Sequence, residues 1–395
     1  NRNEARGCAR LEGLYIIDMP TKNQTTAFGN WTNFDDTYIS STNLTIGYNQ
    51  RVDTLRGNDT ITSSSSTAQF SISGQLDMGK GNDQILFDKL HVYGYTVLGE
   101  GDDKITGSYM YNQVYIDFGS GSDLLDISTL DNSYNNSISM GAGNDSIRLA
   151  STPGQYEVFG LGRYNNVGAA IDMGSGSDIF LINSNSSTGS NFGSITLGLE
   201  SENESDYFGG IQRSSSVGLP VGAEGNGLNN DGIIQAGGGA DIIVGQGTYN
   251  SYGIANTGSL LLGSGDDLLT DALTGEIVST GIFGSTDQTY LPAFTTYLGI
   301  LNNGTIDMGI GNDAVRAYTI SGTGTWNGGD GTDKILLGKD GTYTVTAVTG
   351  GFSINGSGVF SSFEQIGVWN SANSPLTLQA GTYTISNNAS TIAFA

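Results

Sequence analysis

Short runs of alternating hydrophobic and polar residues recur along the chain, and many of them end at a pair of glycines. Residues 76–85 show the pattern in full: apolar-x-apolar-Gly-x-Gly-x-Asp-x-apolar. Alternation with a period of two is typical of a strand with one face turned inward. Glycine tolerates the positive φ angles of a tight turn, where a side chain would clash. The pattern therefore predicts a strand, a glycine turn that ends at an aspartate, and a return to the interior on the next strand.

The glycine part of this pattern, Gly-x-Gly-x-Asp-x-apolar, occurs nine times, and a weaker copy ends at Asp59. Nine copies with aspartate and an apolar residue in register identify a repeat protein. The glycines and aspartates of the nine copies are Gly79, Gly81, Asp83; Gly99, Gly101, Asp103; Gly119, Gly121, Asp123; Gly141, Gly143, Asp145; Gly174, Gly176, Asp178; Gly237, Gly239, Asp241; Gly263, Gly265, Asp267; Gly309, Gly311, Asp313; and Gly329, Gly331, Asp333.

The spacing of these aspartates predicts the architecture. Asp83, Asp103 and Asp123 are 20 residues apart, which suits one complete coil of a solenoid. The opposite half-coils, such as residues 89–97 and 108–116, contain strand residues and show no second glycine turn. We therefore expect an all-β, parallel β-solenoid in which the aspartate turns stack along one edge only.

Stacked turns would place carboxylates side by side, and close carboxylates repel one another unless a cation lies between them. Carboxylate and turn carbonyl oxygens are hard ligands, which suit calcium better than zinc or copper. We expect several Ca²⁺ ions along this edge, each shared by two neighbouring turns. The clearest ladder is predicted at 83, 103, 123 and 145, with further stretches at 241 with 267 and at 313 with 333. Asp102 and Asp266 are candidate additional ligands, with solvent exposure as the alternative.

These repeats resemble the RTX (hemolysin-type) calcium-binding nonapeptide, Gly-Gly-x-Gly-x-Asp-x-U-x, which builds a parallel β-roll. Residues 328–336 match the nonapeptide completely, whereas most other copies replace its first glycine by an apolar residue such as Met78 or Leu98. The family usually runs its nonapeptides in tandem, and here they are interrupted, which favours a broader, irregular solenoid. The resemblance covers roughly residues 50–370 and implies calcium binding, secretion and an extracellular or cell-surface location.

Three regions are predicted. Residues 1–50 lack the motif and are interpreted as an N-terminal cap, or alternatively as an arm that pairs with another subunit. Residues 51–340 form the calcium-binding solenoid, with inserts near 151–170, 199–233 and 270–305. The acidic run 201–206 is interpreted as a solvated loop in preference to an altered cation site. Residues 341–395 are expected to form a C-terminal cap, and the resemblance adds a possible secretion signal there.

Composition and charge narrow the function. A net charge of −24 disfavours binding to nucleic acid or to an anionic membrane, and no apolar run is long enough for a transmembrane segment. Cys8 is the only cysteine, which excludes an internal disulfide. His91 is the only histidine and is interpreted as an ordinary strand residue. Carboxylates that repeat in every coil indicate a structural ladder, because a catalytic pair would occur once. We therefore expect that the protein is not an enzyme.

The expected function is that of an extracellular, calcium-dependent structural protein of the cell surface, such as an S-layer, sheath or filament subunit that self-associates. One alternative is the calcium-binding, secretion-competent region of a larger adhesin or hydrolase. Another is a module that binds cell-surface polysaccharide.

Overall fold

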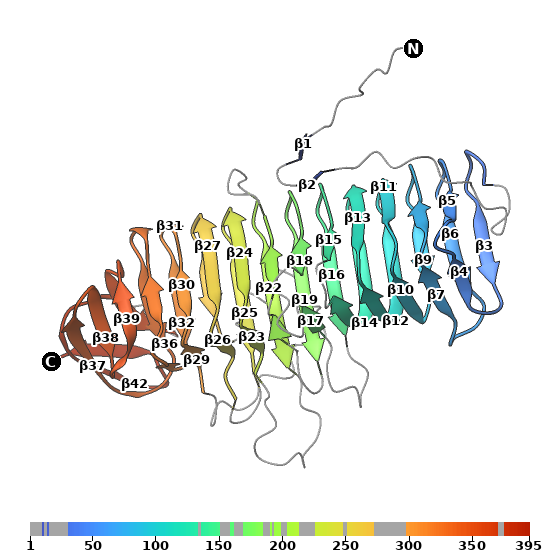
Figure 1. The fold of residues 1–395 in the computed structure, drawn as a ribbon. Helices are drawn as coiled ribbons and strands as arrows, with labels where there is room; N and C mark the ends of the chain where they lie inside the picture. The colour runs from blue at the N-terminus through green and yellow to red at the C-terminus, as the bar shows by residue number, and fades with distance from the viewer. Residues whose placement is uncertain are drawn as a thin grey trace.

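The computed structural model describes residues 10–11, 14–15, 31–132, 136–150, 159–161, 169–184, 190–191, 193–198, 204–212, 226–247, 251–271, 298–369 and 375–395. The described residues form strands, turns and bends, and no helix is present among them. Most strands pair in parallel with the equivalent strand of the coils before and after, so the chain winds into an elongated parallel β-solenoid (Figure 1). The predicted all-β solenoid is confirmed.

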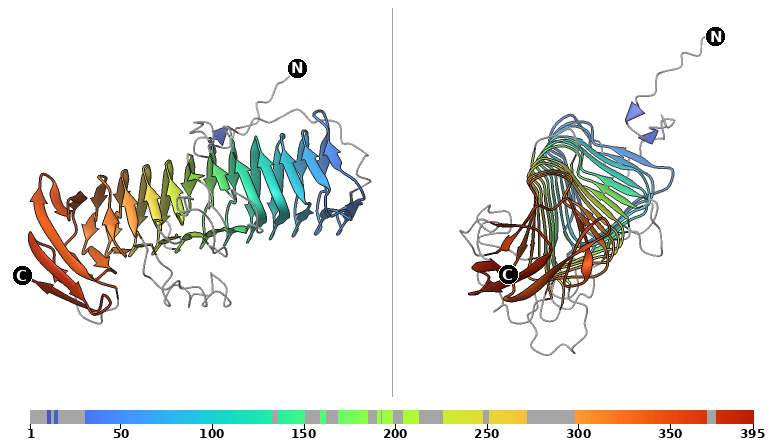
Figure 2. Two further views of the ribbon diagram at one scale, coloured as in Figure 1. Left: turned by 90° about the horizontal axis from the view of Figure 1, so that it is seen from below. Right: turned by 90° about the vertical axis from the view of Figure 1, so that its left-hand side faces the viewer.

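Each coil contributes strands to three rows, which form separate faces in the end-on view (Figure 2). The first row precedes the glycine turn and consists of β5 (Arg51–Asp53), β8 (Gln75–Asp77), β11 (Thr96–Glu100), β13 (Tyr115–Ser120), β15 (Ser137–Ser139), β18 (Ala170–Asp172), β21 (Ser194–Thr196), β24 (Ile233–Gly238), β27 (Ser259–Ser264), β30 (Thr305–Asp307) and β34 (Thr325–Asn327), with the short β31 (Ile310–Gly311) and β35 (Asp330–Gly331) inside two of the turns.

The second row follows the glycine turn. It consists of β3 (Thr37–Ser40), β6 (Thr60–Ser63), β9 (Gln84–Leu86), β12 (Lys104–Asn112), β14 (Leu124–Asn132), β16 (Ser146–Ala150), β19 (Ile179–Ser184), β22 (Tyr207–Gln212), β25 (Ile242–Gln246), β28 (Leu268–Thr270), β32 (Ala314–Ala317), β36 (Lys334–Leu337) and β40 (Gln365–Val368). The third row consists of β4 (Leu44–Ile46), β7 (Gln69–Ile72), β10 (Lys89–Val92), the second halves of β12 and β14, β17 (Phe159–Leu161), β20 (Ser190–Asn191), β23 (Leu228–Asn230), β26 (Ile254–Asn256), β29 (Ile300–Asn302) and β33 (Ile320–Ser321).

The core is a continuous column of apolar side chains inside the coils. The residue just before each glycine turn belongs to it: Met78, Leu98, Phe118, Met140, Met173, Ala236, Leu262 and Met308 are all fully buried. These are the positions at which the nonapeptide pattern has its first glycine. The departure from that pattern therefore has a packing reason, because this position faces inward and fills the column.

A second corner, between the third row and the next first-row strand, also contains stacked glycines. A Cβ at Gly94 would lie 1.9 Å from the Gly74 carbonyl oxygen, and a Cβ at Gly258 would lie 2.0 Å from that of Gly232. Residues 89–97 thus contain a corner glycine, Gly94, but it is single and is not among the glycines with positive φ, and residues 108–116 contain no glycine, so neither half-coil has a second glycine turn of the motif type. No ladder of buried carboxylates accompanies these glycines in the described part of the chain, so the aspartate ladder remains on one edge.

The buried groups at this second corner are amides. Asn191 Nδ2 donates to Asn230 Oδ1, Asn230 Nδ2 to Asn256 Oδ1, and Asn256 Nδ2 to Asn302 Oδ1, each at 2.8 Å. All four side chains are at most 1% exposed. Asn112 donates in the same way to Asn132, at 2.9 Å. The amides satisfy one another and the corner carbonyls, which removes the cost of burying them.

The parallel coils give way to an antiparallel sheet at the C-terminal end (Figures 1 and 2). This sheet contains β39 (Ser357–Ser361), β38 (Gly351–Ile354), β37 (Gly341–Val348), β42 (Gly381–Ser386) and β43 (Thr391–Phe394), while β41 (Leu376–Thr377) pairs with β40. Near the other terminus, β1 (Arg10–Leu11) pairs with β2 (Leu14–Tyr15). The division of the chain at residues 50 and 340, the caps and the secretion signal stay predictions.

Much of the three predicted inserts lies outside the described residues, namely 151–158, 162–168, 199–203, 213–225 and 272–297. Cys8 also lies outside them. Within the described part of the chain, no helix has the length and hydropathy needed to span a membrane.

Candidate functional site: the aspartate ladder

The predicted aspartates lie in one row along the edge between the first and second strand rows. Each carboxylate accepts a hydrogen bond, through Oδ1, from the backbone N–H of the aspartate one coil earlier. Asp103 Oδ1 accepts from Asp83 N–H at 2.7 Å, and Asp123 Oδ1 accepts from Asp103 N–H at 2.7 Å. The same link joins Asp36, Asp59, Asp83, Asp103, Asp123, Asp145, Asp178, Asp206, Asp241, Asp267, Asp313 and Asp333 in unbroken succession. The separate stretches predicted from the sequence are therefore parts of one ladder.

The two glycines of each turn allow this stacking. Gly99 has a φ of 123° and Gly101 a φ of 132°, values that L-residues with a side chain rarely adopt. A Cβ at Gly99 would lie 1.9 Å from the Gly79 carbonyl oxygen, and one at Gly101 would lie 2.1 Å from that of Gly81. Backbone carbonyls of consecutive turns are thus packed directly against glycine Cα atoms. Each predicted glycine of the nine motifs has a positive φ, between 96° and 158°, and belongs to one of these two stacks.

The second carboxylate oxygen, Oδ2, is the part of each ladder aspartate that bears on function. Oδ2 is buried and has no hydrogen-bond partner in the described part of the chain at Asp59, Asp83, Asp103, Asp123, Asp145, Asp267, Asp313 and Asp333. These eight side chains are at most 2% exposed, and none of them belongs to the three ion pairs found among the described residues. An unsatisfied buried anionic oxygen is costly. A row of them at equivalent positions indicates that the ladder needs a compensating partner, either a proton or a cation.

The surroundings of these carboxyl groups favour the neutral form in the absence of a cation. Burial is the largest cause: it raises the pKa of Asp83, Asp103 and Asp313 to about 7, and that of Asp123 and Asp267 to about 8. Neighbouring carboxylates raise these pKa values further, and the backbone hydrogen bond at Oδ1 lowers them. Burial also raises the pKa of Asp145 to about 6 and raises those of Asp59 and Asp333. A bound cation would reverse this preference, because it stabilises the ionised carboxylate.

One ladder residue was misinterpreted from the sequence. Asp206, assigned to a solvated acidic loop, is fully buried and joins Asp178 to Asp241. Its turn lacks the second glycine, yet the backbone follows the usual path: a Cβ at Gly239 would lie 1.7 Å from the Glu204 carbonyl oxygen. Residues 199–203, which interrupt the motif, lie outside the described residues. The long interval from 178 to 241 therefore contains two coils that meet at Asp206.

The last rung of the ladder is a glutamate. Asp333 N–H donates to Glu364 Oε2 at 2.8 Å, so Glu364 takes the place that aspartate has in the other coils. Pairing of Asn327 with Ser361 and of Lys334 with Gln365 leaves three residues for this turn instead of six, and it has no glycine pair. The extra methylene of glutamate compensates for the shorter turn. Sequence analysis had assigned this residue to the C-terminal cap and not to the ladder.

A second, outer ladder flanks the buried one. Asp102 Oδ1 accepts the Ser122 backbone N–H at 2.8 Å, and Asp266 Oδ1 accepts that of Asn312 at 2.8 Å. Both side chains are exposed, so they agree with the solvent-exposed alternative, although each also stabilises the stacking of its turn on the next. Asparagines 58, 82 and 144 accept the same hydrogen bond in other coils.

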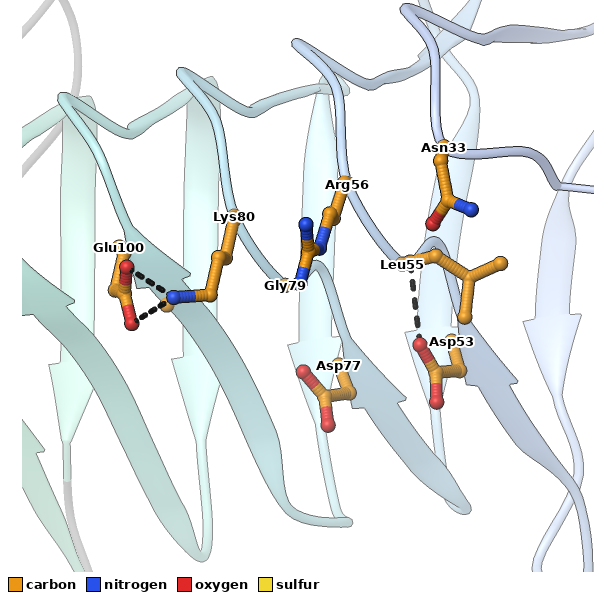
Figure 3. Close-up of a pocket in the computed structure, with 9 residues that line it drawn as sticks. Asn33, Asp53, Leu55, Arg56, Asp77, Gly79, Lys80 and Glu100 are labelled. Atoms are coloured by element: carbon orange, nitrogen blue, oxygen red, sulfur yellow. Dashed lines mark hydrogen bonds and ion pairs between the residues drawn. The ribbon is translucent and has the colours of Figure 1, made fainter.

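An open, charged depression lies beside the first turns (Figure 3). Asp53 and Asp77 line it, and Arg51 pairs with both, at 3.2 and 3.0 Å. Leu55, also in its lining, has a φ of 77°, the left-handed conformation that glycine has in the other turns. The weaker first copy of the motif thus keeps the turn geometry at a cost of about 1–2 kcal/mol for a non-glycine residue. The depression contains no unsatisfied buried group and has no recognisable ligand chemistry.

The donor set of the aspartate ladder constrains any metal bound there. No group of three or more His, Cys, Asp or Glu side chains suitable for a metal ion occurs in the described part of the chain. A cation at the ladder would therefore depend on backbone carbonyls of the glycine turns together with Oδ2 of one or two aspartates, an all-oxygen set. Comparison of the chain with family models, with curated proteins and with solved structures finds no match, so the structure establishes a β-solenoid with a stacked ladder of buried aspartates and no family.

Proposed function

We propose that this protein is a calcium-dependent structural protein of the cell surface, in which a row of Ca²⁺ ions along the aspartate ladder completes the fold. One observation carries the proposal: the buried Oδ2 atoms of eight ladder aspartates, at equivalent positions in their turns, have no hydrogen-bond partner among the residues that the structure describes. Calcium accepts six to eight oxygen ligands in flexible geometry, which suits carboxylates supplemented by carbonyls. The resemblance of residues 328–336 to the RTX nonapeptide supports the same metal.

The net charge of the chain supports calcium as the compensating partner of the ladder. The chain has a net charge of −24, and on the order of eight divalent ions would cancel most of it. Without them the ladder carboxyls must either protonate or remain ionised in a buried row. Ionised neighbours would repel along the whole edge, so removal of calcium should lower the stability of the stacked coils. Calcium binding is then coupled to folding, as in other structural metal sites.

The cell-surface role rests on architecture and on the resemblance. An elongated solenoid is suited to a scaffold, and the buried aspartates repeat in successive coils instead of forming a single reactive pair. Self-association into an S-layer, sheath or filament, an extracellular location and the lack of enzymatic activity are parts of this proposal. A calcium-binding region of a larger adhesin or secreted hydrolase is the alternative.

Calcium titration of chelator-treated protein tests the proposal, with circular dichroism and light scattering recorded together. Growth of β-structure and of particle size over the same calcium range is the expected result. Folding to a monodisperse monomer would favour the alternative of a module from a larger protein. Equal β-structure and thermal stability in chelator and in calcium would refute the role of the ladder, and magnesium at the same concentration serves as the control cation.

A further inference from the structure

A cluster of aromatic rings lies on the outer side of the third strand row, away from the aspartate edge. His91, on β10, is in edge-to-face contact with three tyrosines. The ring centroids lie 6.0 Å from Tyr93, 5.9 Å from Tyr109 and 5.9 Å from Tyr111, with interplanar angles of 80°, 67° and 69°. Parallel pairing of β10 with β12 sets His91 directly beside Tyr111. The cluster therefore spans two coils on one outer face.

Polar groups orient these rings. The Gln69 amide Nε2 donates to His91 Nδ1 at 3.2 Å, and the Tyr93 hydroxyl lies 3.2 Å from the same nitrogen. A ring nitrogen that accepts from an amide carries no proton, so the proton of the neutral imidazole is on Nε2. Burial, and secondarily Lys89, lower the pKa of His91, which keeps the ring neutral at neutral pH. On the next coil, Gln113 Nε2 donates to the Tyr111 hydroxyl.

The combination of groups indicates what could bind. Tyr93 is 40% exposed, and the cluster has aromatic rings, hydroxyls, two carboxamides and an imidazole N–H. One charge of each sign borders it, because Tyr109 pairs with Lys89 and Tyr111 pairs with Asp131 on the neighbouring strands. Ring faces pack against the C–H faces of sugars, while amide and imidazole groups bond to sugar hydroxyls, so this is the chemistry of a carbohydrate site. Neighbouring coils are about 4.8 Å apart, on the scale of one sugar unit. A polyanionic chain is disfavoured by the net charge of −24.

We propose that this aromatic face, formed by Gln69, His91, Tyr93, Tyr109, Tyr111 and Gln113, binds a neutral polysaccharide. The proposal goes beyond the calcium-dependent scaffold, because the face is built from strand residues of the third row and uses no ladder group. It would give the scaffold a means of attachment to a glycan layer. Sequence analysis had considered a module that binds cell-surface polysaccharide, without a site on this face, and had interpreted His91 as an ordinary strand residue.

Affinity electrophoresis of the full chain in calcium tests the proposal. The gels contain, one at a time, a soluble β-1,4-glucan, a β-1,3-glucan, an α-1,6-glucan and an α-mannan. At least one should retard the wild-type protein, and the double variant Tyr93→Ala, Tyr111→Ala should bind about tenfold more weakly, the effect of losing about 1.4 kcal/mol. Tyr48→Ala is the matched control, because Tyr48 is 76% exposed and lies outside the aromatic face. It should be retarded like the wild type.

A fifth gel contains polygalacturonate, an anionic probe. The proposal would be overturned if none of the four neutral polysaccharides retards the protein, whether or not polygalacturonate does. It would also be overturned if the double variant is retarded as strongly as the wild type. Circular dichroism in calcium, recorded on every variant, separates loss of binding from loss of folding. A failure of the calcium proposal would be visible in those spectra for the wild-type protein, independently of any polysaccharide. The variant Tyr93→Phe, Tyr111→Phe keeps both rings and should retain part of the binding.

Discussion

Replacing Asp103 by asparagine should change stability in opposite directions with and without calcium. Asparagine keeps an Oδ1 that can accept the Asp83 N–H, a bond of 2.7 Å in the structure, and it replaces the buried Oδ2 by an uncharged NH₂. In chelator the substitution removes a carboxyl whose pKa burial raises from 3.8 to about 7. In calcium it removes an anionic oxygen from the sites on both sides of the turn. Whether the substitution raises or lowers the free energy of unfolding therefore shows whether protons or cations compensate the ladder carboxylates.

The magnitudes follow from burial and charge. A pKa raised from 3.8 to about 7 corresponds to roughly 4 kcal/mol above pH 7 for an isolated group. The penalty is smaller in the ladder, because neighbouring carboxyls share it and the turn can relax. Asp103→Asn should therefore raise the free energy of unfolding by about 1–2 kcal/mol in chelator at pH 7.5. At pH 5.5 the folded carboxyl is protonated but the unfolded one is still ionised, so the penalty for an isolated group falls to roughly 2 kcal/mol and about half of the gain should disappear. In millimolar calcium the loss of a charged ligand should cost about 2–4 kcal/mol.

Urea unfolding followed by circular dichroism measures both signs, in chelator and in calcium at the two pH values. Asp102→Asn is the control one residue away: Asp102 is exposed and its Oδ1 accepts the Ser122 N–H, a bond that asparagine preserves. It should change the free energy of unfolding by less than about 0.5 kcal/mol in every condition. Stabilisation by Asp103→Asn in calcium as well as in chelator would refute the reasoning, since it would show that protons, not cations, compensate the ladder.

Four further outcomes are expected. Six ladder carboxyls, those of Asp83, Asp103, Asp123, Asp145, Asp267 and Asp313, have pKa values of about 6 to 8 in the fold against 3.8 for an ordinary aspartate. In chelator the thermal midpoint should therefore be highest near pH 4 and fall as pH rises to 8, whereas calcium should abolish this decline. Leu55→Gly should raise the free energy of unfolding by about 0.5–1 kcal/mol, because glycine adopts the φ of 77° without strain; an unchanged urea midpoint would contradict this. Gly99→Ala should lower the free energy of unfolding by more than about 3 kcal/mol, because its Cβ would lie 1.9 Å from a carbonyl oxygen. Gly356→Ala, whose Cβ would have no atom within 4 Å, should lower it by about 1 kcal/mol in the same urea assay. Asn230→Ala should lower the free energy of unfolding by about 2–4 kcal/mol, because it breaks hydrogen bonds to Asn191, Asn256 and the Ser259 carbonyl. The loss should be the same with and without calcium, and a calcium-dependent loss would show that the amide corner and the aspartate edge are coupled.

The strands and the aspartate edge could be predicted because their requirements are local. A strand with one buried face needs alternation with a period of two, and a turn with positive φ at two places needs glycine there. Both requirements appear in a single copy of the motif. Repetition at about one coil length then implies stacking, which brings Asp83 and Asp103 together although they are 20 residues apart.

The missed residues are those whose role depends on the neighbouring coil. Asp206 keeps its place without a glycine pair, since backbone positions at Gly198 and Glu204 stand under the two glycines of the next turn. Glu364 keeps the last place through a longer side chain across a shorter turn. Neither substitution preserves the local pattern.

The amide ladder had a signal that could have been recognised. The sequence Asn-x-Gly-x-apolar occurs at residues 191–195, 230–234, 256–260 and 302–306, each ending at a fully buried residue. The intervals between these copies vary, so a search for a constant repeat length misses them. Side-chain amides can bond to one another in a row without any ion, which explains how this corner tolerates variable coil lengths.

Both ends of the aspartate ladder are closed, and this limits how copies can associate. At the first rung, Asp36 Oδ2 accepts the Thr32 backbone N–H at 2.6 Å and the Thr32 hydroxyl at 2.8 Å, so this oxygen is already satisfied. At the last rung, the Glu364 backbone N–H donates to the Asp333 carbonyl oxygen at 3.1 Å, and the antiparallel sheet that contains β37, β38, β39, β42 and β43 lies at this end of the solenoid (Figure 1). A second copy placed on either end would meet no free rung to continue. If the protein assembles as we propose, calcium should complete each subunit internally, and contacts between subunits should come from outer faces or the edge of β43. Assembly would then depend on calcium through folding, without calcium at the interface.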